Sequence, residues 1–256
     1  MIRKRQWHVR SKWIRHLGLI GQRRLRRHIP PTSLLSRKTL NTYMKRYRVL
    51  YIKPVFGSFG NHIMKLSRSP RARGRYVVRR EQRVQVITGR QVPGVVMRHA
   101  RSRAFLIQRG IPLLHIGGHP VDYRLMMLRP GREWQFMGIM GKVASGARIV
   151  TNYNHGGKAI RFRESLRRAG FTPRQIDRVF AEMRRVGYLA ARQFGSRHKH
   201  CRRLGIDFAI DTNKRIWIIE VNTNPFYELF RHHENRTLYR RIHGVMQRIS
   251  RLQSNR

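Results

Sequence analysis

The sequence predicts an α+β fold in which antiparallel strands and amphipathic helices form one unit. The first observation is the hairpin of residues 205–225, where two apolar, β-branched runs flank a polar turn. The second is residues 173–194, where apolar residues recur at helical spacing. The third is the lack of any internal repeat or low-complexity linker. With 256 residues, 40% of them hydrophobic, the chain is long enough to bury a sizeable core.

The N-terminal part of the chain predicts two helices. Apolar residues spaced among the arginines of residues 1–28 indicate an amphipathic helix, which Pro30 interrupts. Residues 34–47 predict a second helix, with Leu40 and Tyr43 among its inner positions. Both helices carry many basic residues, and Glu81 is the first acidic residue of the chain.

The middle of the chain predicts mainly strands. Apolar runs indicate strands at 49–52, 62–66, 76–80, 83–88, 105–108, 121–128 and 134–143, and a short helix at 93–101. Two glycine-rich loops, 57–61 and 151–158, interrupt this pattern. The first is either an ordinary turn or a loop whose backbone N–H groups bind phosphate beside Lys53. The second is either a surface turn or a flap over a charged substrate.

Two helices are predicted in the C-terminal half. The helix over 173–194 has Thr172 as its N-cap and Gly195 beyond its end. Its apolar stripe is typical of core packing. The core-facing positions predicted for the last helix are Leu238, Ile242, Val245, Ile249 and Leu252.

The 205–225 hairpin also places acidic residues in an apolar setting. If its strands fold back around Asp211 and Ile216, Asp207 lies opposite Glu220 and Asn222 shares their face. Facing carboxylates repel each other, so the arrangement requires a cation. Carboxylate and amide oxygens suit Mg²⁺. The alternative is that both carboxylates pair with arginines, of which the chain has many.

Arg124 lies inside an apolar strand, where an unpaired guanidinium would be costly. One interpretation is an ion pair with Asp122, which lies two residues earlier on the same face. The other is contact with a bound phosphate. The sequence leaves both open.

The charge of the chain is its most unusual property. Lys and Arg number 57 against 11 Asp and Glu, giving a formal net charge of +46. Such a chain is expected to bind polyanions: nucleic acid, anionic polymers or acidic protein segments. No run of 18 apolar residues predicts a membrane span, and no apolar signal region is present. One cysteine, Cys201, excludes an internal disulfide and fits a reducing compartment, the cytoplasm.

The order of the motifs is the most specific signal. The blocks are IKPVFGSFGNHI, FLIQRGIPL, PVDYRLMM, IVTNYNHGG and GIDFAID followed by IWIIEVNTNP. Over about residues 30–250 this succession resembles the ATP-grasp superfamily of carboxylate–amine ligases. Within it, the chain is most similar to the YheC/YheD family of endospore coat-associated proteins.

The resemblance implies two α+β subdomains with antiparallel sheets that grip ATP between them. It places a basic N-terminal helical segment at 1–29 and the ATP-grasp domain at 30–250. Within that domain, about 49–108 would form the small ATP-lid subdomain and 109–250 the metal- and substrate-binding subdomain. Fewer than 50 residues precede the first ATP strand. The N-terminal domain usual in the family is therefore expected to be absent or truncated.

The resemblance also assigns roles to residues. The ATP-binding set is Lys53 and the loop Gly57, Ser58, Phe59, Gly60 and Asn61 at the phosphates, Gln108 and Ile111 at the adenine hinge, and Asp122 at the ribose. Arg124, Asn152, Gly156, Gly157 and Lys158 would face the γ-phosphate and an acyl-phosphate intermediate. Asp207, Glu220 and Asn222 would hold one or two Mg²⁺ ions. The hinge residue common in the superfamily is acidic, whereas here it is Gln108.

The function implied is an ATP- and Mg²⁺-dependent ligase that joins a carboxylate to an amine or a thiol and is associated with the endospore coat. Its carboxylate substrate and acceptor are unspecified, and an acidic polymer or protein would suit the charge. The alternative from another class is a non-enzymatic, polyanion-binding coat or nucleoid protein on a degenerate ATP-grasp scaffold.

Overall fold

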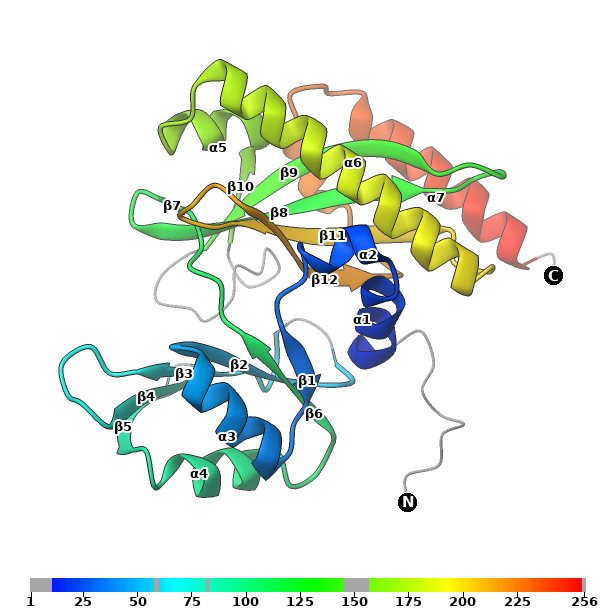
Figure 1. Cartoon of the computed structure of the whole chain (residues 1–256). Coiled ribbons are helices and arrows are strands. Elements are labelled where there is room, and N and C mark those ends of the chain that lie inside the picture. The colour runs from blue at the N-terminus through cyan, green and yellow to red at the C-terminus, as the bar shows by residue number, and fades with distance from the viewer. Residues whose placement is uncertain (1–10, 58–59, 82, 145–156, 255–256) are drawn as a thin grey trace.

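The computed structural model describes residues 11–57, 60–81, 83–144 and 157–254, and its strands form two sheets (Figure 1). In the first sheet the strand order is β1-β6-β2-β3-β4-β5, and every neighbouring pair is antiparallel. Its strands are β1 (Thr32–Leu34), β2 (Val49–Pro54), β3 (Met64–Arg68), β4 (Arg75–Arg80), β5 (Arg83–Thr88) and β6 (Phe105–Arg109). The predicted hairpin over 76–88 is confirmed as β4 and β5.

Two helices, α3 (Arg37–Arg46) and α4 (Val92–His99), cover one side of the first sheet (Figure 1). The buried apolar residues of α3 and α4 pack with those of β2, β3, β4 and β6 in one cluster. The expected helix over 34–47 begins later than predicted. Ser36 caps it with its side chain, and the residues before this cap form the edge strand β1.

The second sheet has the order β10-β9-β8-β11-β12, with β7 paired to β8. Its strands are β7 (His115–Ile116), β8 (His119–Leu128), β9 (Gln135–Val143), β10 (Lys158–Arg161), β11 (Arg203–Ile210) and β12 (Ile216–Asn222). Side chains alternate along β8, as expected for a strand buried on both faces. Tyr123 and Leu125 belong to the cluster on one face, and Met126 and Leu128 to the cluster on the other.

Helices cover both faces of the second sheet (Figure 1). On one face lie α5 (Phe162–Arg168) and α6 (Pro173–Arg197), and on the other lie the short helix η3 (Glu228–His232) and α7 (Leu238–Ser254). Along α7, Leu238, Ile242 and Ile249 are buried as predicted. The prediction for Leu252 is wrong, because this side chain is exposed near the end of the helix.

Helix α6 begins at the predicted residue and ends three residues later than predicted, at Arg197. Thr172 and Gln175 exchange side-chain-to-backbone hydrogen bonds at its start, which confirms the predicted N-cap. Gly195 does not end the helix but lies inside it, buried against Trp134. A Cβ atom there would come within 2.8 Å of the indole Nε1. The glycine therefore permits close packing, rather than providing a C-cap.

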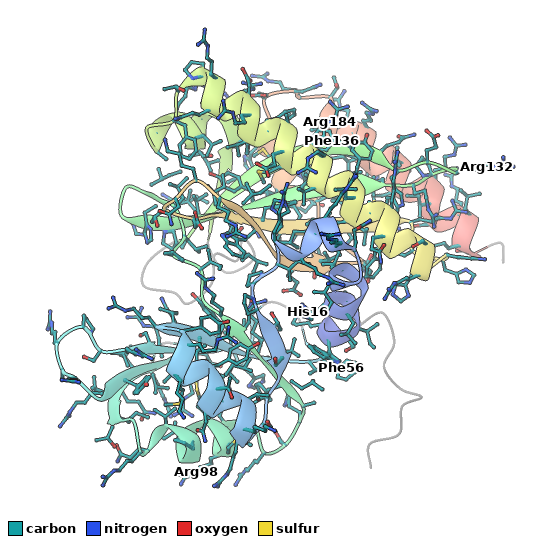
Figure 2. All side chains as sticks on the ribbon, viewed as in Figure 1. His16, Phe56, Arg98, Arg132, Phe136 and Arg184 are labelled. Atoms are coloured by element: carbon teal, nitrogen blue, oxygen red, sulfur yellow. The ribbon has the colours of Figure 1, made fainter. Side chains whose placement is uncertain are left out.

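The N-terminal helices α1 (Lys12–Ile20) and α2 (Arg23–Arg26) lie against the second sheet and α6 (Figure 1). Leu19, Leu25 and Ile29 are part of the same core cluster as the buried residues of α6. His16 of α1 lies in the space between the two sheets (Figure 2). Residues 12–29 thus contribute to the core as well as to the charge of the chain.

Basic side chains are not confined to one part of the described surface. Figure 2 shows Arg98 on α4, Arg132 between β8 and β9, and Arg184 on α6, in three widely separated places. No helix in the described part of the chain is both long and apolar enough to cross a bilayer.

Candidate active site

The centre of the site is the pairing of β11 with β12. The structure confirms that Asp207 lies opposite Glu220, although the turn is one residue out of the predicted register. Ile210, rather than Asp211, pairs with Ile216, and a register shift follows between Phe208 and Asp207. Ile219 is the extra residue of this β-bulge. The bulge brings Glu220 to the position opposite Asp207.

Asp207 is held by a buried set of donors. Arg124 binds it through two hydrogen bonds, Nε to Oδ1 at 2.7 Å and an Nη2 bond to Oδ2 at 3.0 Å. Lys142 Nζ lies 3.0 Å from Oδ1, and Asn222 Nδ2 donates to Oδ2 at 3.1 Å. Burial favours a raised pKa, but the charges of Arg124 and Lys142 outweigh it and hold the pKa of Asp207 well below its usual range.

Asp122 and Arg124 do not form the ion pair that the sequence left open. Arg124 lies opposite Asp207 in the β8–β11 register and pairs with it instead. Asp122 pairs with Lys142, whose Nζ lies 2.8 Å from Oδ1. Lys142 therefore links the two carboxylates. Burial alone would lower the pKa of Lys142, whereas these two negative charges raise it.

Glu220 is the more accessible of the two facing carboxylates. Its side chain is 26% exposed, against 12% for Asp207. Lys12 Nζ lies 2.6 Å from Oε1, and Arg15 Nη2 lies 3.7 Å from the same oxygen. Burial would raise the pKa of Glu220, but the charges of Lys12 and Arg15 outweigh it and lower the pKa. Both contacts are made to Oε1.

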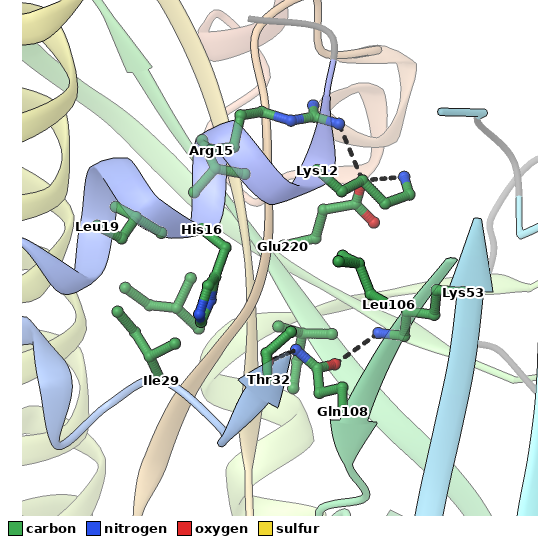
Figure 3. Close-up of a pocket in the computed structure, with 13 residues that line it drawn as sticks. Lys12, Arg15, His16, Leu19, Ile29, Thr32, Lys53, Leu106, Gln108 and Glu220 are labelled. Carbon is green, nitrogen blue, oxygen red and sulfur yellow. Dashed lines mark hydrogen bonds and ion pairs between the residues drawn. The ribbon is translucent and has the colours of Figure 1, made fainter. Parts of the chain in front are cut away.

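Lys53 approaches this site from the first sheet. Its Nζ donates to Gln108 Oε1 at 2.7 Å, and Gln108 Nε2 in turn donates to Thr32 Oγ1 at 3.0 Å (Figure 3). These three side chains come from β2, β6 and β1. Burial lowers the pKa of Lys53 to about 8, so it is still mostly protonated at pH 7.

A cavity of about 40 Å³ separates the two sheets at this point (Figure 3). It is lined by Lys53, Leu106 and Gln108 from the first sheet, residues 218–221 from β12, Ile29 and Thr32, and Lys12, Arg15, His16 and Leu19 from α1. Burial lowers the pKa of His16 to about 4, so His16 is neutral at pH 7 and adds no charge. The cavity could hold about one water molecule and is far smaller than a nucleotide site.

The hairpin presents three side chains with oxygen donors, Asp207, Glu220 and Asn222. Across the described ranges, no three His, Cys, Asp or Glu side chains converge so as to hold a metal ion. The amide of Asn222 lies outside that residue set, and a 180° rotation would exchange its nitrogen and oxygen. Two facing carboxylates and an amide oxygen fit a Mg²⁺ ion that takes its other ligands from phosphate and water.

The structure brings together most of the residues that the sequence singled out on strands. Arg124 pairs with Asp207, and Lys142 links Asp207 to Asp122. Lys53 and Gln108 also interact through their side chains. Ile111 is buried in a separate small cluster with Ala209 and Trp217. Lys158 begins β10 opposite Val143, next to Gly157. Ser58, Phe59, Asn152 and Gly156 lie outside the described residues, whereas Gly57, Gly60 and Asn61 are the described residues of the first loop.

The sequence interpretation missed three basic residues at this site. Lys142 is buried in a strand predicted as apolar, and the reasoning applied to Arg124 would have identified it. Lys12 and Arg15 come from the N-terminal helix, which was predicted as a separate basic segment. No local pattern in the sequence connects that helix to Glu220.

Two antiparallel sheets, with Lys53 on one and Asp207 and Glu220 on the other, define an ATP-grasp protein. The sequence model of the YheC/D like ATP-grasp family matches residues 3–249. The chain therefore belongs to the YheC/D-like ATP-grasp family.

Individual proteins show the same relationship. The endospore coat-associated protein YheD of Bacillus subtilis (strain 168) is 24% identical over 234 residues, which are 87% of this chain and 49% of that one. The chain thus spans about half the length of this relative. The crystal structure of D-cycloserine synthetase DcsG matches with a TM-score of 0.57 and 10% identity, over 93% of this chain and 70% of the other.

A second solved structure is the ATP-grasp ligase PsnB, complexed with a phosphomimetic variant of its minimal precursor, Mg and ADP. It matches with a TM-score of 0.53 and 11% identity, over 94% of this chain and 58% of PsnB. At these identities the two structures establish the shared fold.

Proposed function

We propose that the chain is an ATP- and Mg²⁺-dependent ligase that activates a carboxylate and joins it to an amine or a thiol. The observation that carries this proposal is the placement of Asp207, Glu220 and Asn222 on one hairpin face, from which Glu220 also lines the cavity that Lys53 lines from the other sheet. Buried carboxylates next to cationic side chains, at the junction of two sheets, suit a site for a charged phosphate chain.

In the proposed reaction, an oxygen of the substrate carboxylate attacks the γ-phosphorus of ATP, and the bond to the β-phosphate oxygen breaks to release ADP. The amine or thiol then attacks the acyl carbon, and inorganic phosphate leaves as the amide or thioester forms. The nucleophile loses one proton to solvent or to a nearby base. Both steps are displacements, so the protein contributes mainly by orienting groups and stabilising charge.

Individual residues have distinct roles in this scheme. Lys53 places a positive charge at the phosphates, and Arg124, fixed by Asp207, is positioned to orient the transferred phosphoryl group. Asp207, Glu220 and Asn222 would together hold Mg²⁺. When bound, the ion neutralises phosphate charge. Lys158 would contact the acyl phosphate.

Nucleotide binding on this scheme requires the two sheets to separate. The cavity of about 40 Å³ is much smaller than the several hundred Å³ that ligand pockets usually provide. Lys12, which contacts both Glu220 and the backbone of Gly57, lies where the sheets approach each other. We infer a closed form, from which hinge opening between the sheets admits ATP.

The cellular setting is proposed from the family. A Bacillus subtilis relative is named for its association with the endospore coat, and we extend this setting to the present chain. The net charge of +46 supports a substrate or partner that is itself acidic.

One observation favours the second candidate, a non-enzymatic protein that binds polyanions on a degenerate scaffold. Both oxygens of Asp207 are already engaged by Arg124, Lys142 and Asn222, and Glu220 is paired with Lys12. These carboxylates therefore serve a structural role in the closed form, whether or not a metal binds.

The deciding experiment is thermal unfolding of the full chain with ATP, with Mg²⁺, and with both. The ligase proposal predicts a rise in Tm that requires both ligands, since binding at about 100 times Kd adds about 2.7 kcal/mol of stability. The second candidate predicts an unchanged Tm at saturating Mg·ATP. A stabilised protein that releases no ADP with any acidic peptide would be a nucleotide-binding scaffold, not a ligase.

A further inference from the structure

A second cavity, of about 660 Å³, lies at the start of β11. Its lining comes from the end of α6 and the segment that follows (196–203), from Thr223 and Asn224 after β12, and from Gln253 on α7. Gln253 Nε2 donates to the His200 carbonyl at 3.0 Å, which joins α7 to this segment. The volume falls within the range of ordinary ligand pockets.

The cavity is lined by basic side chains. They are Arg197, His198, Lys199, His200, Arg202 and Arg203. Among the described lining residues there is no Asp or Glu. The carboxyl end of α6 contributes only a partial negative charge, which these side chains outweigh. The cavity therefore has a positive potential suited to an anionic ligand.

Arg203 is the most constrained of these side chains. Its Nη2 donates to Ser250 Oγ at 2.7 Å and to Gln253 Oε1 at 3.2 Å, which fixes the guanidinium against α7. Its Nε is buried and has no hydrogen-bond partner among the described residues. Burial lowers the pKa of Arg203, and no described carboxylate pairs with it. An anionic oxygen in the cavity would offset the cost of burying this positive charge.

The wall of the cavity is held in place by two other arginines. Arg129 Nη2 donates to the carbonyls of Lys199 and Cys201 at 2.6 and 2.9 Å. Arg202 Nη1 donates to the carbonyls of Arg129 and Gly131 at 3.2 and 3.0 Å. Four bonds thus tie the 199–202 segment to the β8–β9 turn. A wall fixed in this way is preorganised for its ligand.

The cavity adjoins the hairpin of the proposed active site along the chain. Thr223 and Asn224 follow Asn222 directly in the chain, and Asn222 pairs with Gly205 on β11. A Cβ atom on Gly205 would lie 2.5 Å from Pro225 and 3.1 Å from Arg124, so the glycine lets both approach the strand. A ligand in the cavity would therefore extend towards Arg124 along the 222–225 segment.

We propose that this cavity binds the side-chain carboxylates of an acidic peptide and so presents one of them to the active site. This names the substrate class of the proposed ligase and rests on that function. A peptide is favoured over nucleic acid because the lining contains no Phe, Tyr or Trp on which bases could stack. A cavity of this size also holds a few side chains, not a length of duplex.

The test measures binding of fluorescein-labelled hexaglutamate to the full chain by anisotropy, at about 150 mM salt to limit diffuse attraction. Lys199→Glu is the first variant, since Lys199 is exposed and its replacement leaves the core intact. Lys45→Glu makes the same charge change at an exposed position on α3 and serves as the control. We expect Kd to rise at least tenfold for Lys199→Glu and less than threefold for Lys45→Glu. Equal losses would overturn the proposal.

A second pair of variants tests the buried guanidinium. Arg203→Gln should raise Kd at least tenfold, and Arg203→Lys should recover part of the loss while both retain the wild-type far-ultraviolet circular dichroism spectrum. Hexathymidylate is then used as a competitor. If it displaces the peptide, and Lys199→Glu weakens the binding of both ligands equally, the cavity binds nucleic acid, which also overturns the proposal.

Mg·ATP binding is measured in parallel to separate this proposal from the ligase function. If the wild-type protein binds the peptide through Lys199 but Mg·ATP does not stabilise it, the peptide cavity stands and the ligase proposal is wrong. If the protein binds Mg·ATP but substitutions of Lys199 and Arg203 leave its peptide affinity unchanged, the ligase proposal stands and the cavity proposal is wrong.

Discussion

The ammonium of Lys12 lies 2.6 Å from the Oε1 of Glu220, which joins the first described helix to the last strand of the second sheet. The same ammonium donates to the carbonyl of Gly57 at 3.0 Å, and the backbone N–H of Lys12 donates to Val55 at 2.9 Å. Both acceptors follow β2 in the first sheet. The start of α1 therefore connects the two sheets at the edge of the proposed active site.

Replacing Lys12 tests this connection. Because Lys12 and Glu220 are largely buried, a double-mutant cycle of Lys12→Met and Glu220→Gln should give a coupling free energy of about 1–3 kcal/mol in urea unfolding at pH 7. The exposed pair Arg231 and Glu228, treated in the same way, should show a smaller coupling. Equal coupling in the two cycles would mean that Lys12 adds nothing beyond a surface contact.

Glu220→Gln alone should abolish most of the stabilisation by Mg·ATP. The substitution keeps the size of the side chain and removes the more accessible carboxylate of the proposed metal site. Differential scanning fluorimetry against Mg²⁺ concentration, at fixed ATP, measures the effect. Glu133→Gln, at an exposed position away from the site, is the matched control and should behave as wild type. Full Mg·ATP stabilisation in Glu220→Gln would exclude Glu220 as a ligand.

Asp207→Asn should weaken the fold itself. It leaves Arg124 and Lys142 buried without their shared carboxylate, a change that typically costs about 3–5 kcal/mol. The pKa of Asp207 is lowered in the folded protein, so its contribution is complete above the unfolded pKa of about 3.9 and is lost as the pH falls below it. The difference in unfolding free energy between wild type and Asp207→Asn should be largest above about pH 5 and should become smaller below about pH 4. Asp177→Asn, at an exposed ion pair, should show neither the loss nor this pH dependence.

Lys53→Met should weaken ATP binding about ten- to one-hundredfold at pH 7 and leave the fold intact. This range corresponds to loss of a charge-assisted hydrogen bond of about 1.5–3 kcal/mol. Because burial lowers the pKa of Lys53 to about 8, the free protein loses this charge above pH 8, and the wild-type Kd for ATP should rise there. Titrations by isothermal calorimetry between about pH 7 and 9 should show that rise in wild type and in Lys65→Met, but not in Lys53→Met. A Lys53→Met protein with wild-type affinity would place the phosphates elsewhere.

The sequence was sufficient to predict the antiparallel strands and the central pairing of the site. Alternating apolar residues and turn chemistry identify β4, β5, β8 and β9 because these signals are local. The face-to-face position of Asp207 and Glu220 was also predicted correctly, although the assumed register of the turn was wrong by one residue. A β-bulge has no distinctive residue pattern here, since Ile219 is an isoleucine like Ile216 and Ile218 on the same strand.

The partners of the site residues could not be predicted, because they come from distant segments. Lys12 and Glu220 are 208 residues apart, and Lys142 and Asp207 are 65 apart. With so many basic residues, composition predicts that carboxylates will be paired but not by which cation. The end of α6 was mispredicted for a related reason, because Gly195 is required by its contact with Trp134, a residue of another element.

At the level of the gene, the bulge at Ile219 makes the two strands of this hairpin unequally sensitive to the deletion of a single codon. Loss of codon 219 would leave a regular ladder in which Glu220 still faces Asp207, whereas loss of codon 208 or 209 would place Asp207 opposite Ile218. A single deletion of an apolar residue from β11 would thus separate the two acidic groups without changing any residue of the site. Inheritance of the site therefore depends on the spacing of its strands as much as on the identity of its charged residues.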